Sequence, residues 1–129
     1  MEMPEDIRAL CDQFRQIGFD IHRYHSYGHI EKVYENALLH RLTKVGIQLE
    51  PQSPVVVQDE DGTILGELRV DFLAEKKLIV EVKAVRALLP EHTSQLLGYL
   101  RASKMEHGLL LNFGAPKFEI RKFALSPNK

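Results

Sequence analysis

The sequence predicts an α/β (α+β) domain in which a central mixed β-sheet is flanked by helices. Three observations carry this prediction: helical periodicity in the first third of the chain, apolar strand-like runs in the middle, and a further helix followed by two short strands. A chain of 129 residues is long enough to bury one core and too short for a second. We therefore expect a single domain over residues 1–129 with the element order αβββαββ.

Two amphipathic helices are expected in the first third of the chain. Apolar residues recur at spacings of three and four over residues 5–17, and residues 31–45 repeat this pattern before a glycine, which commonly ends a helix. The intervening segment allows the first helix to continue as far as Arg23 before it breaks near Ser26 and Gly28.

The remaining elements are five strands and a third helix. The strand-like segments are short, rich in β-branched and apolar residues, and separated by turn-like sequence. They are residues 54–58, 64–73, 78–85, 108–113 and 118–125. Pro90 suits the first turn of a helix that extends to about residue 104. The first three strands are expected to form an antiparallel meander.

Composition excludes several classes of protein. The net charge of −1 argues against a protein that coats nucleic acid nonspecifically, because phosphate binding relies on excess Lys and Arg. The single cysteine, Cys11, cannot form an internal disulfide and is expected to be a buried apolar side chain. No signal sequence opens the chain, and no apolar run approaches the ~18 residues of a membrane span. We expect a cytoplasmic protein that does not bind membranes.

The most informative motif joins two neighbouring strands: Asp71 on one, and Glu81 followed two residues later by Lys83 on the other. If the connection at residues 75–77 sets the register, Asp71 lies directly opposite Glu81, and alternation places Arg69 and Lys83 on the same face. The opposite, apolar face would carry Val70, Phe72, Val80 and Val82. Two facing carboxylates repel each other, and a divalent cation relieves that repulsion. Oxygen ligands favour Mg²⁺ or Mn²⁺.

Two alternatives remain open at this point. The charged strand face can simply be solvated, with Glu81 and Lys83 in ordinary ion pairs. A different site, for zinc, would form if His22, His25 and His29 lined one unbroken helical face.

A second motif, Gly28-His29-Ile30-Glu31-Lys32-Val33-Tyr34, resembles the Gly-x-x-Glu-x-x-Tyr signature of small bacterial proteins called the GxxExxY family, which belongs to the PD-(D/E)xK nuclease superfamily. Further matching segments span about residues 17–123. They are Ile21-His22-Arg23, Leu65-Gly66, Arg69-Val70-Asp71, Glu81 to Val85, His92 with Gln95 and Tyr99, and Asn112-Phe113-Gly114. The chain departs from the family by having Ser26-Tyr27 where a Gly-Pro turn usually precedes Gly28. The resemblance implies a restriction-endonuclease-like core.

The resemblance also implies roles for individual residues. The expected metal ligands are the carboxylates of Asp71, Glu81 and Glu31 and the backbone carbonyl of Val82. Lys83 is expected to hold or help deprotonate the attacking water, and Gln95 to assist near the metal-bound strand. Four side chains complete the expected site as substrate-binding residues: Arg69, His92, Tyr99 and Tyr34.

The resulting expectation is a Mg²⁺- or Mn²⁺-dependent nuclease that hydrolyses nucleic acid, with DNA as the expected substrate. The alternative is a catalytically weak module that binds nucleic acid or protein and retains the nuclease fold. Because no separate DNA-binding segment is evident, target selection is expected to come from a homodimer or a protein partner. The sequence leaves open the choice between DNA and RNA, the strandedness of the substrate and the biological pathway.

Overall fold

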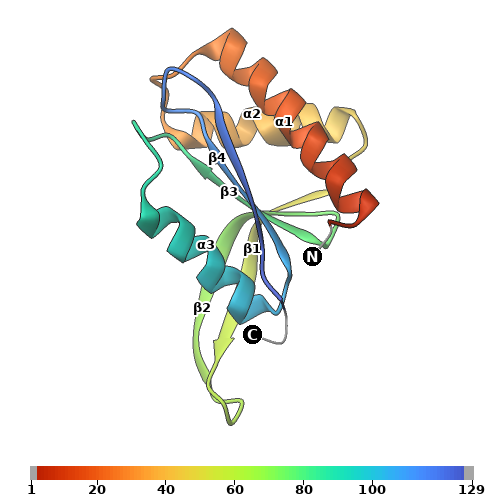
Figure 1. Cartoon of the computed structure of the whole chain (residues 1–129), viewed down its shortest axis with the longest axis vertical. Helices are drawn as coiled ribbons and strands as arrows, with labels where there is room; N and C mark the ends of the chain where they lie inside the picture. Colours follow the sequence, from red (N-terminus) through yellow and green to blue (C-terminus); the bar gives the residue numbers. More distant parts are fainter. Residues whose placement is uncertain (1–2, 127–129) are drawn as a thin grey trace.

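The structure, a computed structural model, describes residues 3–126 and confirms the predicted fold class. Its elements are α1 (Glu5–His25), α2 (Glu31–Lys44), β1 (Leu49–Gln58), β2 (Ile64–Ala74), β3 (Leu78–Lys83), α3 (Pro90–Ser103), β4 (His107–Asn112) and β5 (Glu119–Ala124). The order ααβββαββ contains both helices expected in the first third of the chain, whereas the order αβββαββ counted only one of them (Figure 1). No helix in the described range is both long and apolar enough to cross a bilayer.

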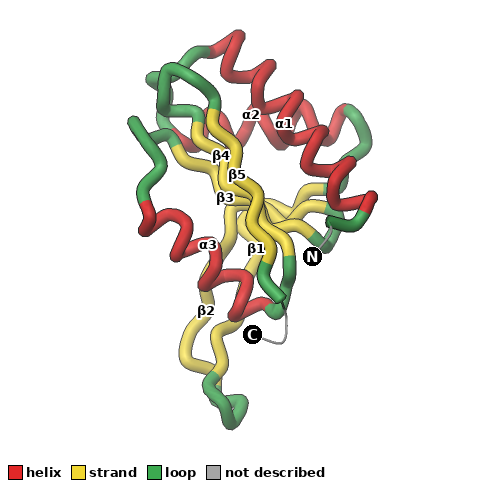
Figure 2. The backbone as a smooth tube through the Cα atoms, in the orientation of Figure 1, coloured by secondary structure: helices red, strands yellow, loops and turns green. Residues whose placement is uncertain are grey.

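One mixed sheet of five strands runs through the molecule in the order β1-β2-β3-β4-β5. The first three strands form the predicted antiparallel meander, and β4 pairs with β5 in the same antiparallel way. The central pair, β3 and β4, is parallel, so the chain must cross over between them, and α3 is that crossover. The sheet is strongly twisted, and the β1–β2 hairpin projects away from the rest of the molecule (Figure 2).

Helices cover both faces of the sheet: α1 and α2 lie on one side and α3 on the other (Figure 1). The core under α1 and α2 contains Phe14, Leu38 and Val80, and it includes Cys11, which is buried as predicted. The core under α3 contains Ile79 and Leu96 among its members. Because both faces are covered, β4 is buried along its whole length and β3 is buried up to Lys83.

Helix α1 continues past residue 17, as the sequence allowed, and ends at His25, two residues beyond Arg23; within it, Gly18 is a packing position. A β-carbon on Gly18 would lie 2.4 Å from the ring of Phe118, so only glycine allows β5 and its turn to pack this closely. The helix ends where Ser26 and then Gly28 adopt positive φ angles of 61° and 118°, close to the predicted break.

Strand β2 does not keep the predicted alternation along its whole length. Phe72, Val80 and Val82 pack under α1 and α2 as expected, but Val70 packs under α3. The change occurs at Asp71, where the β1–β2 ladder omits the pair with Gln52 and Gln52 has a φ of 50°. The prediction that Val70 shares a face with the other three residues is therefore wrong, because the strand twists at the irregular pair.

Candidate metal centre

The centre is built where β2 and β3 separate. Their ladder ends at the pair of Phe72 with Val80, and the next pair in this register is Asp71 with Glu81. At that pair, the backbone N–H of Asp71 donates to Glu81 Oε2 at 2.6 Å, and the N–H of Val82 donates to Asp71 Oδ2 at 2.7 Å. Carboxylates thus satisfy backbone donors at the point where strand-to-strand pairing stops.

Helix α2 brings two further carboxylates to Asp71. Side-chain oxygens of Glu31, Glu35 and Asp71 lie within 4.8 Å of one another, and among residues 3–126 this is the one such group of His, Cys, Asp or Glu ligands. Glu31 is the first residue of α2, and Glu35 follows one turn later on the same helix face. The Gln52 amide donates to Glu35 Oε1 at 3.5 Å.

The three-acid group differs from the metal set expected from the sequence. Glu35 was not among the expected ligands, although its spacing of four residues from Glu31 was a signal that could have found it. Glu81 lies beside Asp71 but outside the group of three. Val82 contributes its N–H to Asp71, and coordination by its carbonyl stays a prediction.

Burial and mutual repulsion disfavour the charged forms of these acids. Burial, followed by the neighbouring Asp71 carboxylate, raises the pKa of Glu81 to about 8 and that of Glu35 to about 7. Burial also raises the pKa of Asp71, and burial together with Asp71 raises the pKa of Glu31. Four acids with raised pKa values at one point are disposed to bind a divalent cation, which stabilises their ionised forms.

The residues present fit a hard cation such as Mg²⁺ or Mn²⁺. The convergent ligands are all oxygens, which hard cations prefer. Glu81 is only 4% exposed, so it does not lie on a solvated strand face. The alternative of a simply solvated face is therefore wrong for this residue, since solvent does not reach enough of it to compensate its charge.

Lys83 lies at the carboxyl end of β3, where α3 fixes its side chain. Its Nζ donates to Gln95 Oε1 at 3.1 Å, so the structure brings these two predicted residues together. Among the described residues, the ion pairs do not include one from Lys83 to Asp71 or Glu81. Its positive charge nevertheless lowers the pKa of both carboxyl groups, although burial outweighs this effect.

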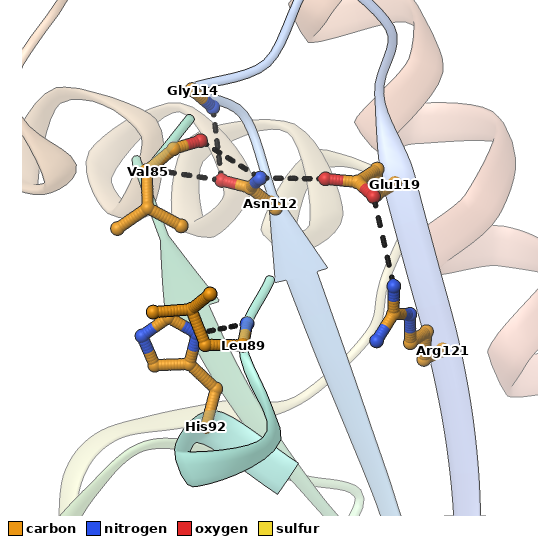
Figure 3. Close-up of polar contacts among 7 residues, drawn as sticks. All are labelled: Val85, Leu89, His92, Asn112, Gly114, Glu119 and Arg121. Atoms are coloured by element: carbon orange, nitrogen blue, oxygen red, sulfur yellow. Dashed lines mark hydrogen bonds and ion pairs between the residues drawn. The ribbon is translucent and has the colours of Figure 1, made fainter. Parts of the chain in front are cut away.

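Asn112, at the end of β4, fixes the segment that follows Lys83 (Figure 3). Its Oδ1 accepts from the N–H groups of Val85 and Gly114, at 2.9 and 3.0 Å, and its Nδ2 donates to Val85 O and Glu119 Oε1, at 2.9 and 2.8 Å. The side chain is fully buried, so these four bonds satisfy it completely. A β-carbon on Gly114 would lie 2.3 Å from Val85 N, which makes glycine necessary there.

Two of the expected substrate-binding residues, Tyr99 and Arg69, differ in how closely they approach the metal centre. Tyr99 is close enough that burial and then the charge of Glu81 raise the pKa of its hydroxyl. Arg69 is exposed, and its guanidinium donates to Gln52 O at 3.0 Å and to Glu67 Oε1 at 3.2 Å. Arg69 therefore reaches the centre only through Gln52 in this structure.

The other two expected substrate-binding residues, Tyr34 and His92, use polar atoms in hydrogen bonds within the protein. Tyr34 is fully buried, stacks on Phe113 with ring centroids 4.8 Å apart, and donates its hydroxyl to Ser26 O at 2.6 Å. His92 Nδ1 accepts from the N–H of Leu89 at 3.0 Å at the start of α3 (Figure 3), leaving Nε2 for other partners. The structure does not support substrate contact by Tyr34, because its side chain is shielded from solvent.

The histidines expected in the zinc alternative do not converge. His22 Nε2 lies 2.9 Å from Ala115 O, while the rings of His25 and His29 pack edge to face with centroids 6.0 Å apart. The group of potential ligands found in residues 3–126 contains no histidine. The structure therefore gives the zinc alternative no support.

Comparison with known proteins agrees with this geometry. Residues 8–123 match the family model described as the PD-(D/E)XK nuclease superfamily. No curated protein matches the sequence. One solved structure, described as the crystal structure of SSO0001, superposes with a TM-score of 0.61 at 18% identity, over 74% of this chain and 50% of that one. The present chain thus spans half the length of that structure, which shows a shared fold. The match over residues 8–123 establishes that the chain belongs to the PD-(D/E)XK nuclease superfamily.

Proposed function

We propose that this protein is a Mg²⁺- or Mn²⁺-dependent nuclease that hydrolyses phosphodiester bonds in DNA. Membership in a superfamily of metal-dependent phosphodiesterases supports the reaction class. The observation that carries the proposal is the convergence of Glu31, Glu35 and Asp71 within 4.8 Å, beside the buried Glu81. Among the described residues, Glu35 has only the mostly exposed Lys32, at 3.9 Å, as an ion-pair partner, and the pKa values of all four acids stay raised. Buried acids that are compensated so little are costly, and metal coordination is the function that accounts for them.

Within the superfamily, we assign the chain to the GxxExxY family on the spacing of Gly28, Glu31 and Tyr34. Each residue of this signature has a role in the geometry. Gly28 has a φ of 118° at the turn before α2, Glu31 joins the acid group, and Tyr34 holds the turn through Ser26 O. The residues of the signature therefore form the turn before α2 and place the Glu31 carboxylate in the acid group.

The acids and Lys83 would have different roles in hydrolysis. Asp71, Glu81, Glu31 and Glu35 would hold the cation. When bound, a divalent cation polarises the phosphoryl oxygen and lowers the pKa of water. Lys83 would donate hydrogen bonds from Nζ to the attacking water or to the phosphoryl oxygens as their negative charge develops. Gln95 Oε1, 3.1 Å from Nζ, holds the ammonium group in place for this role.

The test is a cleavage assay on labelled single-stranded, double-stranded and branched DNA and on RNA, with Mg²⁺, with Mn²⁺ and with chelator. Lys83→Ala is expected to lower the cleavage rate by about 10² or more while metal binding persists, because a charge that stabilises the transition state is lost. Lys77→Ala is the matched control. Lys77 lies in the turn at the other end of β3, where it pairs with Asp6 at 2.8 Å.

The outcomes separate the proposed nuclease from a binding module that retains the fold. Metal-dependent cleavage that survives Lys77→Ala and is lost in Lys83→Ala supports the nuclease. Equal cleavage by both variants assigns the activity to another site or to a contaminant. Binding of nucleic acid without cleavage under any metal condition favours the catalytically weak module.

A further inference from the structure

An exposed segment rich in aromatic and basic side chains comprises the last three residues of α1 and the connection from α1 to α2. We call residues 23–30 the aromatic loop; its aromatic, basic and apolar members are Arg23, Tyr24, His25, Tyr27, His29 and Ile30. Tyr24 is 79% exposed, Tyr27 53% and Ile30 73%. Single exposed apolar residues are ordinary on protein surfaces, but here three large ones fall within seven positions of one short segment.

The rings of the loop form a continuous series that leads from solvent into the core. Tyr24 packs edge to face on His25 with centroids 4.8 Å apart, and His25 packs in the same way on His29 at 6.0 Å. His29 contacts Tyr34 at 5.8 Å, and Tyr34 stacks on Phe113 at 4.8 Å with the ring planes 5° apart. The exposed ring of Tyr24 is therefore connected to a buried aromatic base through His25 and His29.

Hydrogen bonds hold the backbone of the aromatic loop in place. The Tyr34 hydroxyl donates to Ser26 O at 2.6 Å and accepts from the N–H of His29 at 3.2 Å. On the other side of the break, His22 Nε2 lies 2.9 Å from Ala115 O in the turn after β4. A surface ordered before binding loses little conformational entropy when a ligand arrives, which favours affinity.

The aromatic loop is attached to the metal centre at two points. Its last residue, Ile30, directly precedes the centre's Glu31. Its aromatic base ends at Phe113, whose N–H donates to Lys83 O at 2.9 Å. Figure 1 shows the α1–α2 connection at the same end of the sheet as the turn that follows β4. A ligand on the loop would therefore extend toward Lys83 and the acids.

The aromatic loop and the metal centre differ in charge. The centre gathers Glu31, Glu35 and Asp71, which repel a polyphosphate backbone until a cation binds. The loop contains no acidic residue, and the Arg23 side chain is 72% exposed while it pairs with Asp20 at 3.6 Å. Exposed aromatic faces beside a cation are the combination that binds unpaired bases and their phosphates.

We propose that the aromatic loop is a stacking platform for the unpaired bases of a single-stranded DNA segment, which it directs toward the metal centre. Tyr24 and Tyr27 present faces to successive bases, and Arg23 contacts the backbone. This inference rests on the proposed function, because it names the strand class that the centre would cleave. Paired bases are already stacked on their neighbours, so the platform favours a single strand over the duplex.

The test is fluorescence anisotropy with a labelled oligothymidine, alone or annealed to oligoadenosine, in the presence of chelator so that binding is measured without a cation. The wild-type protein is expected to bind the single strand more tightly than the duplex. Tyr24→Leu and Tyr27→Leu keep apolar bulk but lose the π face, and each is expected to weaken single-strand binding about tenfold. Tyr24→Phe and Tyr27→Phe are expected to bind like the wild type.

Phe19→Leu is the matched control, because Phe19 is 54% exposed on α1 outside the loop. Equal binding of single strand and duplex, unchanged binding by both leucine variants, or an equal loss in Phe19→Leu would each overturn the platform. Lys83-dependent cleavage that is insensitive to the tyrosine changes refutes the platform and leaves the nuclease intact. Tyrosine-dependent binding without any metal-dependent cleavage refutes the nuclease and leaves the platform intact.

Discussion

The two ends of β3 pair with β2 in different ways. At the Leu78 end, β3 and β2 are joined by regular backbone hydrogen bonds. At the Lys83 end, side-chain carboxylates take the place of those bonds. Leu78, Ile79 and Val80 pair with β2 in regular register and are buried among apolar side chains. Beyond them, the carboxylates of Glu81 and Asp71 accept the backbone N–H groups that a neighbouring strand would otherwise bind. The apolar ladder and the acid cluster thus occupy opposite ends of one six-residue strand.

The difference shows how a small fold can place acids inside its core. Parallel pairing with β4 continues through Lys83, so β3 stays fixed although β2 has diverged. The divergence opens room for α2 to bring Glu31 and Glu35 to Asp71. Part of the stabilisation that regular pairing with β2 would provide is given up at this end, as is common at functional sites.

Substitutions at the two ends are expected to have different effects on the free energy of unfolding. Leu78→Ala removes a fully buried side chain from the ladder end and should lower the free energy of unfolding by about 2–5 kcal/mol. Glu81→Gln removes a buried acid of raised pKa and should leave the metal-free protein at pH 8 equally or more stable. Urea denaturation monitored by circular dichroism measures both.

Leu65→Ala is the control for the first change, because Leu65 is 64% exposed near the start of β2 and its loss should cost less than about 0.5 kcal/mol. Strong destabilisation by Glu81→Gln would show that the Glu81 carboxyl group stabilises the fold. The two ends of β3 would then not differ in their contribution to stability.

Stability of the metal-free protein should fall as the pH rises. The pKa values of about 8 for Glu81 and about 7 for Glu35 lie above that of an unfolded glutamate, so the folded state binds more protons at intermediate pH. The resulting stabilisation is complete below the unfolded pKa and is lost as the pH rises through the folded values. Because each unit of pKa shift corresponds to about 1.4 kcal/mol, we expect a progressive loss of several kcal/mol between about pH 5 and about pH 9.

Urea denaturation across this pH range, with chelator present, measures the effect. The double variant Glu35→Gln, Glu81→Gln should show a much flatter profile, and Mg²⁺ should restore the wild-type protein at high pH because it binds the ionised acids. A wild-type profile that rises with pH would contradict the placement of these acids in a desolvated cluster.

A smaller effect is expected where β4 fixes the segment after Lys83. Asn112→Ala leaves the buried partners in Val85, Gly114 and Glu119 unsatisfied and should lower the free energy of unfolding by about 1–3 kcal/mol. Asn36→Ala, at an exposed position on α2, should change it by less than about 0.5 kcal/mol. Equal thermal shifts in the two variants would show that the Asn112 contacts do not hold the segment.

The sequence predicted the helices and strands well because their signals are local. Periodicity located each element, and the register of the β2–β3 hairpin followed from the length of its turn. The role of Gly18 could not be predicted, because the reason for a glycine at this position of α1 lies in Phe118, a hundred residues away in sequence.

The parts of the site that the sequence did not predict depend on tertiary contacts. Glu35 looks like one more acid on a solvated helix face until α2 is packed against Asp71. The change of face at Val70 comes from the positive φ of Gln52 on another strand. The four hydrogen bonds of Asn112 join β4 to two turns and a neighbouring strand, which no local pattern shows.

The central claim, that the separated ends of β2 and β3 and the start of α2 form one cation site, is tested most directly by isothermal titration calorimetry with Mn²⁺. The wild-type protein should bind with release of protons, and more tightly as the pH approaches about 8, because Glu81 must ionise. Asp71→Asn and Glu35→Gln should each weaken binding about tenfold or more, since each removes a charged ligand. Glu67→Gln, a change at an exposed acid of β2, should leave it unchanged. A wild-type protein that does not bind Mn²⁺, or an Asp71→Asn variant that binds it equally well, would contradict the account.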